Sequence, residues 1–151
     1  TGIMKMYRMM RIIGLLFVFT LMAHQVSAQC KTFAKNKCMP SLDDYMLNGR
    51  LYASYMRQGQ ESELNLVLNG GQKYRLIACA KESLGNVWVR LTDANGKVLY
   101  DNAEHDFAST WDFSVKSTQE FKVKTFIQTP ETKNELEVRD CSVILVGSKI
   151  E

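Results

Sequence analysis

The chain contains little histidine, and this scarcity limits the chemistry that it can perform. Only His24 and His105 occur among its 151 residues, and no Cys-x-x-Cys pair is present. A serine triad needs a histidine base, and structural zinc sites are built from cysteine and histidine ligands at characteristic spacings. No motif supplies a nucleophile, a base and an orienting group together. We therefore predict a protein without enzymatic activity, zinc site or cofactor.

The sequence also lacks an apolar run of the roughly 20 residues that a membrane-spanning helix needs. The uncharged apolar run from Ile12 to Ala23 is shorter, follows the basic residues Lys5, Arg8 and Arg11, and is followed by Val26-Ser27-Ala28. This order of a basic segment, an apolar segment and small residues is typical of a secretory signal peptide. We predict cleavage after Ala28 and export to the periplasm or the medium.

Excess charge of one sign is absent once the predicted signal is removed. Three of the 19 Lys and Arg residues lie in the signal, which leaves 16 basic against 16 acidic residues. Nucleic acid binding needs a clustered positive surface, so we expect no nucleic acid partner. No linker or internal repeat divides the remaining chain. We predict a signal peptide at 1–28, a disulfide-stapled N-terminal segment at 29–49 and a β-sandwich domain at 50–151.

Four cysteines follow the predicted cleavage site. An even number of cysteines in an exported chain is typical of disulfides. Lipid attachment at Cys30 would require a small residue before it, but Gln29 occupies that position, so we do not expect lipidation. Four cysteines allow three pairings. We favour Cys30–Cys38, which closes a short loop, and Cys79–Cys141, which joins two strand-like segments.

Apolar residues alternate with polar ones from Leu64 onward, as in half-buried β-strands. Clear examples are 64–68, 74–78, 87–91, 111–115 and 121–123. Turn residues separate these runs, and Asn95-Gly96 is a strong hairpin signal. In the last segment Leu136 and Val138 have one parity, but Cys141, Val143 and Leu145 have the other, so we expect a β-bulge or a short turn near 139–140. The pattern predicts an all-β, antiparallel, jelly-roll-like β-sandwich.

The order of motifs from residue 71 to 126 resembles bacterial pre-peptidase C-terminal domains. The resemblance rests on a Tyr-centred strand at 74–76, an L-x-D-x-x-G-x-x-L unit at 91–99, and aromatic strands at 111–113 and 121–123. The N-terminal block is similar to small uncharacterised exported proteins of Bacteroidetes-type bacteria. The resemblance implies an exported sandwich but transfers no active-site or binding residue.

One candidate surface follows from parity on two of the predicted strands. Trp88 alternates with Val89 and shares its face with Arg90, while Phe126 shares its face with Lys122 and Lys124. If the valines face the core, these aromatic residues lie on the outer face, where aromatic side chains can contact a protein or a sugar. The alternative is that a loop or the N-terminal segment covers them. We predict that Trp88, Arg90 and Phe126 form a ligand surface.

A second candidate is a polar cluster in an interstrand connection. Oxygen-rich loops can bind calcium, although the spacing here matches no EF-hand loop, and a solvated loop is the simpler interpretation. The possible calcium ligands are Asp101, Asn102, Glu104, Asp106 and Asp112.

The sequence therefore predicts an exported, non-enzymatic binding module at the cell envelope, with a protein or glycan as its partner. The alternatives are a calcium-dependent carbohydrate-binding or hydrolytic domain, and an accessory or pro-domain-like helper of a separately encoded protein.

Overall fold

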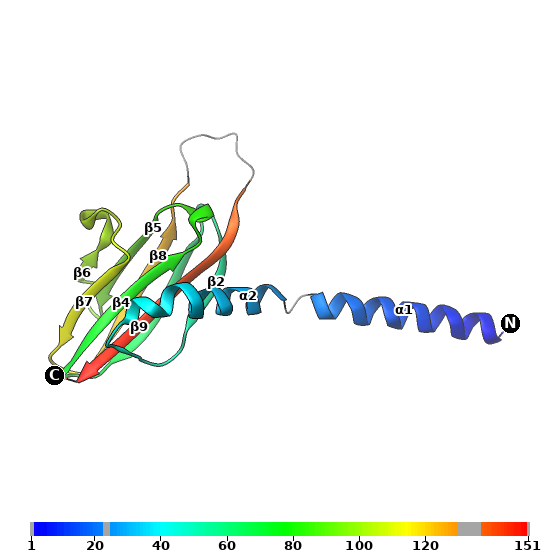
Figure 1. Ribbon diagram of the computed structural model, residues 1–151, viewed down its shortest axis with the longest axis horizontal. Coiled ribbons are helices and arrows are strands. Elements are labelled where there is room, and N and C mark those ends of the chain that lie inside the picture. Colours follow the sequence, from blue (N-terminus) through cyan, green and yellow to red (C-terminus); the bar gives the residue numbers. More distant parts are fainter. Residues whose placement is uncertain (1, 23–24, 130–136, 151) are drawn as a thin grey trace.

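A computed structural model describes residues 2–22, 25–129 and 137–150. Ala23 of the predicted signal and Leu136 of the last predicted strand lie outside the described residues. The body of the chain is a sandwich of two antiparallel sheets, and α1 (Gly2–Met22) projects away from it (Figure 1). Among the described residues, no helix is both long and apolar enough to cross a membrane. The predicted antiparallel β-sandwich is confirmed.

Sheet A contains the central strands β9 and β4, with β7 on one edge and with β1 and β2 along the other. Its strands are β1 (Met46–Leu47), β2 (Tyr52–Arg57), β4 (Gln72–Ala80), β7 (Thr110–Val115) and β9 (Arg139–Ile150). Sheet B has the order β3-β8-β5-β6. Its strands are β3 (Glu61–Leu68), β5 (Val87–Asp93), β6 (Val98–Asp101) and β8 (Gln119–Ile127).

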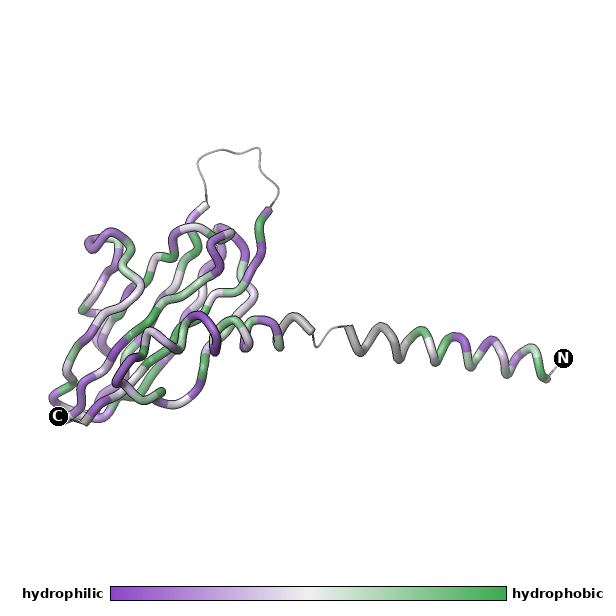
Figure 2. Tube along the Cα trace, viewed as in Figure 1, coloured by the Kyte–Doolittle hydropathy of each residue, from purple (hydrophilic) through white to green (hydrophobic). Residues whose placement is uncertain are grey.

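The pairs β5–β6, β4–β7, β3–β8 and β2–β9 are nested within one another along the chain and alternate between the sheets. This is the strand arrangement of a jelly roll. The innermost pair is the predicted Asn-Gly hairpin, in which Gly96 has φ +79° and Asp93 N donates to Lys97 O at 3.0 Å. Hydrophobic and hydrophilic residues are interleaved along the strands, as Figure 2 shows.

Three apolar clusters hold these layers together. The main cluster lies between the sheets and includes Tyr74, Leu91 and Val123. A smaller one at one end of the sandwich is formed by Met56, Leu84 and Ile127. The third lies on the outer face of sheet A, against the N-terminal segment. Its fully or almost fully buried members are Ala34, Cys38, Leu42, Ile77, Val143 and Leu145.

The third cluster explains why apolar residues of both parities occur in the last strand, β9. Register between β9 and its neighbours runs without interruption from Arg139 to Ile150, so the predicted bulge is wrong. Ile144 and Val146 face the space between the sheets, while Val143 and Leu145 face the N-terminal segment. Both faces of this central strand are buried, which makes both parities apolar.

The N-terminal segment is helical and lies across the outer face of sheet A. It comprises α2 (Gln25–Phe33), a π-helical turn (Ala34–Cys38) and a 3₁₀ turn (Met39–Leu42). The segment and sheet A meet closely at Gly147, where an added Cβ would lie 2.7 Å from Leu42 Cδ2 and 2.8 Å from Tyr45 Cβ. Glycine at 147 therefore permits this contact.

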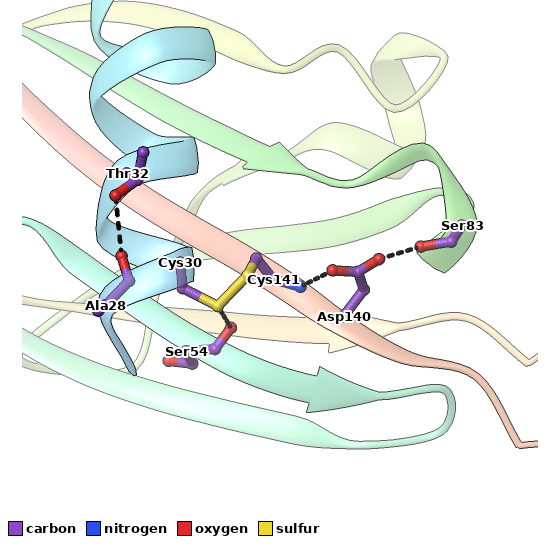
Figure 3. Close-up of a disulfide and its surroundings, with 7 residues drawn as sticks. All are labelled: Ala28, Cys30, Thr32, Ser54, Ser83, Asp140 and Cys141. Atoms are coloured by element: carbon purple, nitrogen blue, oxygen red, sulfur yellow. Dashed lines mark hydrogen bonds between the residues drawn. A yellow bond between two sulfur atoms is a disulfide. The ribbon is translucent and has the colours of Figure 1, made fainter. Parts of the chain in front are cut away.

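Two disulfides fix the segment to the sheet, and their pairing corrects our prediction. Cys30 pairs with Cys141 at a Cα–Cα distance of 5.2 Å, and Cys38 pairs with Cys79 at 5.8 Å. Figure 3 shows the first of these bonds, which joins α2 to β9. Because residues 30–38 are helical rather than a loop, the Cα atoms of Cys30 and Cys38 are roughly 12 Å apart along the axis, too far for a bond.

Candidate functional site

Trp88, Arg90 and Phe126 lie together on the outer face of sheet B, half-buried. Trp88 and Phe126 are direct cross-strand partners on β5 and β8, and their rings meet edge to face with centroids 6.5 Å apart. Val89 and Leu91, which alternate with Trp88 and Arg90, are buried between the sheets. Strand alternation therefore brings the three side chains to one surface, which we call the Trp88 surface.

One carboxylate fixes the orientation of two of these side chains. Asp101 at the end of β6 accepts a hydrogen bond from Trp88 Nε1 at 2.7 Å through Oδ1. Its Oδ2 accepts from Arg90 Nε at 2.9 Å and Arg90 Nη2 at 2.8 Å. The guanidinium group lies 4.6 Å from the centroid of the Trp88 ring. The indole and the guanidinium are thus held in place by contacts within the protein itself.

The same contacts keep Asp101 ionised. Burial alone would raise the pKa of this carboxyl, but hydrogen bonds from Arg90, the backbone N–H of Ala103 and the Trp88 indole lower its pKa below the usual value. The depressed pKa means that the carboxylate stays charged and holds its donors at any pH above its usual range. No metal is needed to balance this charge, because Arg90 supplies the countercharge.

Paired charges and a shallow groove flank the Trp88 surface. Lys124 pairs with Glu61 and Lys122 with Glu63, each at 2.9 Å, on the strands β8 and β3. Phe126 also lines an open groove of about 660 Å³. The other lining residues are Gln58, Leu84, Gly85, Asn86, Gln128 and Thr129. The surface therefore combines an aromatic centre with a neutral groove on one side and compensated charges on another.

The structure does not bring the possible calcium ligands together. Asp101 faces outward from sheet B, whereas Asp112 on β7 faces outward from sheet A and binds Arg75. The Asn102 side chain accepts from Val89 N and donates to the carbonyls of Val87 and Ala108. Glu104 and Asp106 are exposed. Within the described ranges, no group of three or more His, Cys, Asp or Glu side chains could hold a metal ion.

His105, the histidine that follows the predicted cleavage site, contributes to an aromatic stack rather than to a catalytic pair. Its ring stacks on Tyr100 with centroids 5.3 Å apart, and Tyr100 stacks on Trp111 at 4.4 Å. These residues lie where the edge strands β6 and β7 meet. The stack therefore closes one open side of the sandwich.

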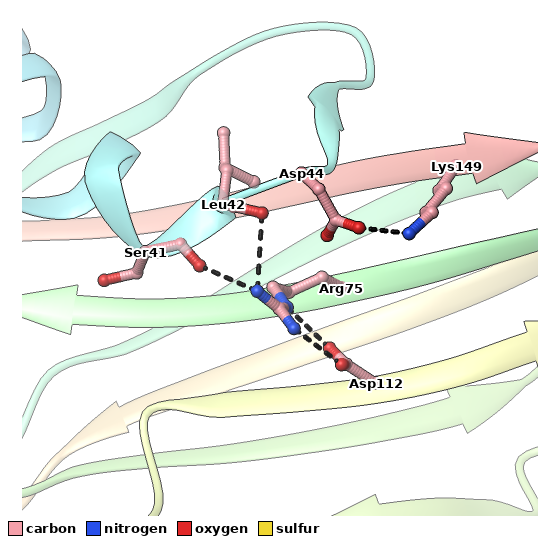
Figure 4. A network of polar contacts seen from close by, with 6 residues as sticks. All are labelled: Ser41, Leu42, Asp44, Arg75, Asp112 and Lys149. Carbon is pink, nitrogen blue, oxygen red and sulfur yellow. Dashed lines mark hydrogen bonds and ion pairs between the residues drawn. The ribbon is translucent and has the colours of Figure 1, made fainter.

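Sequence reasoning missed a polar clamp on the opposite face of the molecule. Arg75 binds both carboxylate oxygens of Asp112 at 2.7 and 2.8 Å and donates to the Ser41 carbonyl at 3.2 Å (Figure 4). The hydrogen bond from Arg75 lowers the pKa of Asp112, and Lys149 lowers that of Asp44 in the same way. The outward parity of Arg75 was visible in the sequence, but its partners 33 or more residues away were not.

Comparison with known proteins gives little further information. No family model matches the chain, so the resemblance of residues 71–126 to pre-peptidase C-terminal domains stays a prediction. No curated protein matches. Among solved structures, a periplasmic inhibitor of g-type lysozyme from Aeromonas hydrophila is similar at 10% identity and a TM-score of 0.48, covering 66% of this chain and 85% of the inhibitor.

Proposed function

We propose that the chain is an exported, non-enzymatic binding module that captures a protein partner through the Trp88 surface. The observation that supports this proposal is the fixed Trp88–Arg90–Asp101 arrangement, with Trp88 and Arg90 half-exposed on the outer face of sheet B. Tryptophan and arginine are enriched among the residues that contribute most to protein interfaces. Side chains that are already ordered lose less conformational entropy on binding.

The geometry favours a protein over a glycan. Sugar rings stack on the open face of an aromatic ring, but the Arg90 guanidinium already lies over the Trp88 ring and Phe126 meets that ring edge to face. A protein side chain or backbone can contact the rim of such a cluster and enter the adjoining groove beside Phe126. Two ion pairs, Lys122–Glu63 and Lys124–Glu61, add polar contacts at the rim, as at many interfaces.

Export is supported by two independent features. The first is the signal-like order of residues 5–28. The second is the pair of disulfides that joins the N-terminal segment to β9 and β4, since such bonds persist in oxidising compartments.

A site-specific crosslink tests the proposal. A photoreactive amino acid at Gln128, in the groove beside Phe126, should give a discrete protein adduct in the native envelope. Trp88→Ala should reduce capture about 30-fold, since hot-spot truncations cost about 2 kcal/mol or more. The matched control is Tyr55→Ala, which removes an aromatic residue that is 49% exposed on β2 and should leave capture unchanged. Equal adduct in wild type and Trp88→Ala would overturn the proposal.

A further inference from the structure

A layer of hydroxyl side chains interrupts the otherwise apolar interior of the sandwich. Ser54 and Ser142 are direct cross-strand partners on sheet A, and Ser62 and Thr125 are direct partners on sheet B. All four line the same cavity between the sheets. Along the sandwich axis, the layer separates the main apolar cluster from the cluster of Met56, Leu84 and Ile127.

Two of these four hydroxyl residues are almost completely buried. Thr125 and Ser142 are each only 3% exposed. No hydrogen bond joins either hydroxyl to another described residue, yet no fully enclosed side-chain oxygen or nitrogen of the described residues lacks a partner. The two hydroxyls therefore reach the cavity surface. A buried hydroxyl without a hydrogen bond costs about 1–3 kcal/mol, so these two hydroxyls favour a hydrogen-bonding molecule in the cavity, either water or a ligand.

The cavity has a defined size and a neutral wall. Its volume is about 170 Å³, and it lies between the edge strands β2 and β3 and their neighbours β9 and β8. Besides the four hydroxyl residues it is lined by Tyr52, Met56, Glu63, Leu64, Val123 and Ile144. Glu63, the one charged residue in the lining, is paired with Lys122. Ser54, on the edge strand β2, is exposed and marks the mouth.

We propose that this cavity binds a small neutral molecule with adjacent hydroxyl groups, either a free polyol or the terminal diol of a sugar. Hydroxyl side chains both donate and accept, so facing pairs from two sheets suit a ligand whose own hydroxyls do the same. The aliphatic wall and Tyr52 suit its C–H groups. A cavity of about 150 Å³ holds a ring of six carbon atoms, and a three-carbon polyol has the same number of heavy atoms. An ionic ligand would find no free countercharge in the lining. This site is separate from the Trp88 surface.

Nuclear magnetic resonance titration of the disulfide-intact protein tests this site. Glycerol and methyl α-glucopyranoside serve as the two probes and distinguish a free polyol from a sugar end. Backbone amides of Ser54, Ser62, Thr125 and Ser142 should shift and saturate with at least one probe. Thr125→Val keeps the shape but removes one hydroxyl, and it should weaken binding about tenfold, the equivalent of 1.4 kcal/mol.

The matched control is Thr110→Val, the same change at an exposed position on β7, which should leave the saturation curve unchanged. Ser142→Ala provides a second loss of a buried hydroxyl if Thr125→Val does not fold. Shifts that stay linear with both probes would show that the cavity holds only water and would overturn the proposal. Shifts that saturate equally in the buried-hydroxyl variants would overturn it as well, because the hydroxyls would then make no contribution to binding.

Discussion

The two outer faces of the sandwich both carry apolar side chains, but within the described residues the N-terminal segment packs only on the outer face of sheet A. On sheet A, Ile77, Val143 and Leu145 lie under the N-terminal segment and are no more than 1% exposed. On sheet B, Trp88 and Phe126 occupy equivalent outward positions and remain half-exposed. The covered face is held by two disulfides and an arginine clamp, whereas the open face is ordered by contacts among its own side chains. This difference makes the outer face of sheet A part of the core, whereas the outer face of sheet B keeps Trp88 and Phe126 half-exposed.

The largest expected loss of stability comes from removing a disulfide between the N-terminal segment and sheet A. Replacing both Cys38 and Cys79 by Ser should lower the free energy of unfolding by about 4 kcal/mol, because the bond closes a loop of 41 residues. Urea unfolding of the oxidised protein measures this loss. The variant should also bind a hydrophobic dye, because residues 34–42 can then move away from Ile77 and Leu145 while Cys30–Cys141 still holds α2.

Peptide mapping without reductant checks the premise of that experiment. It should recover Cys30 linked to Cys141 and Cys38 linked to Cys79. Recovery of a peptide containing a Cys30–Cys38 bond would contradict both the pairing and the covered face.

A smaller loss of stability is expected when the N-terminal segment is displaced from sheet A without breaking a disulfide. Gly147→Ala places a Cβ too close to Leu42 and Tyr45 and should destabilise the protein by about 1–3 kcal/mol. A double-mutant cycle with Leu42→Ala sharpens the result, since removing the nearest atom should relieve part of the cost. Strictly additive effects would show that the segment does not rest on Gly147.

Sequence patterns predicted where strands form better than they predicted which distant segments pack against each strand. Alternation identified the strands from Leu64 onward but not β1 and β2, and Asn95-Gly96 identified the central hairpin. Alternation also placed Trp88 and Phe126 on an outer face, but it could not show whether a distant segment covers that face. The same ambiguity affects Ile77, whose outward position is buried because residues 34–42 lie over it.

Two errors have the same physical origin. The expected bulge in the last strand arose because a strand buried on both faces has no polar side. The expected Cys30–Cys38 bond assumed a loop where the chain is helical. Both depend on the packing of the N-terminal segment against sheet A, which is a contact between residues far apart in sequence. The hydroxyl layer was hidden for a related reason, since serine and threonine at inward positions look like ordinary breaks in alternation.

The smallest expected effect is a pH dependence of the Trp88 surface. The folded protein lowers the pKa of the Asp101 carboxyl. The ionised carboxylate therefore contributes its full stabilisation at pH values above the ordinary pKa near 3.9. This stabilisation is lost as the pH falls through the lowered pKa of the folded state. The indole N–H resonance of Trp88 should therefore stay constant from pH 7 to about 4 and shift only below that range. Asp101→Asn should abolish the titration. A midpoint above the ordinary value would contradict the proposed hydrogen bonding, and Trp111 provides a reference resonance within the same spectrum.

Covalent footprinting of Trp88 in its native setting measures whether a partner covers the outer face of sheet B. Hydroxyl-radical labelling would be compared between the purified protein and the intact envelope, with Tyr55, exposed on β2, as the internal reference. We expect Trp88 to be labelled in the purified protein and strongly protected in the envelope, while labelling of Tyr55 does not change. Equal labelling of Trp88 in both settings would contradict a partner on the outer face of sheet B.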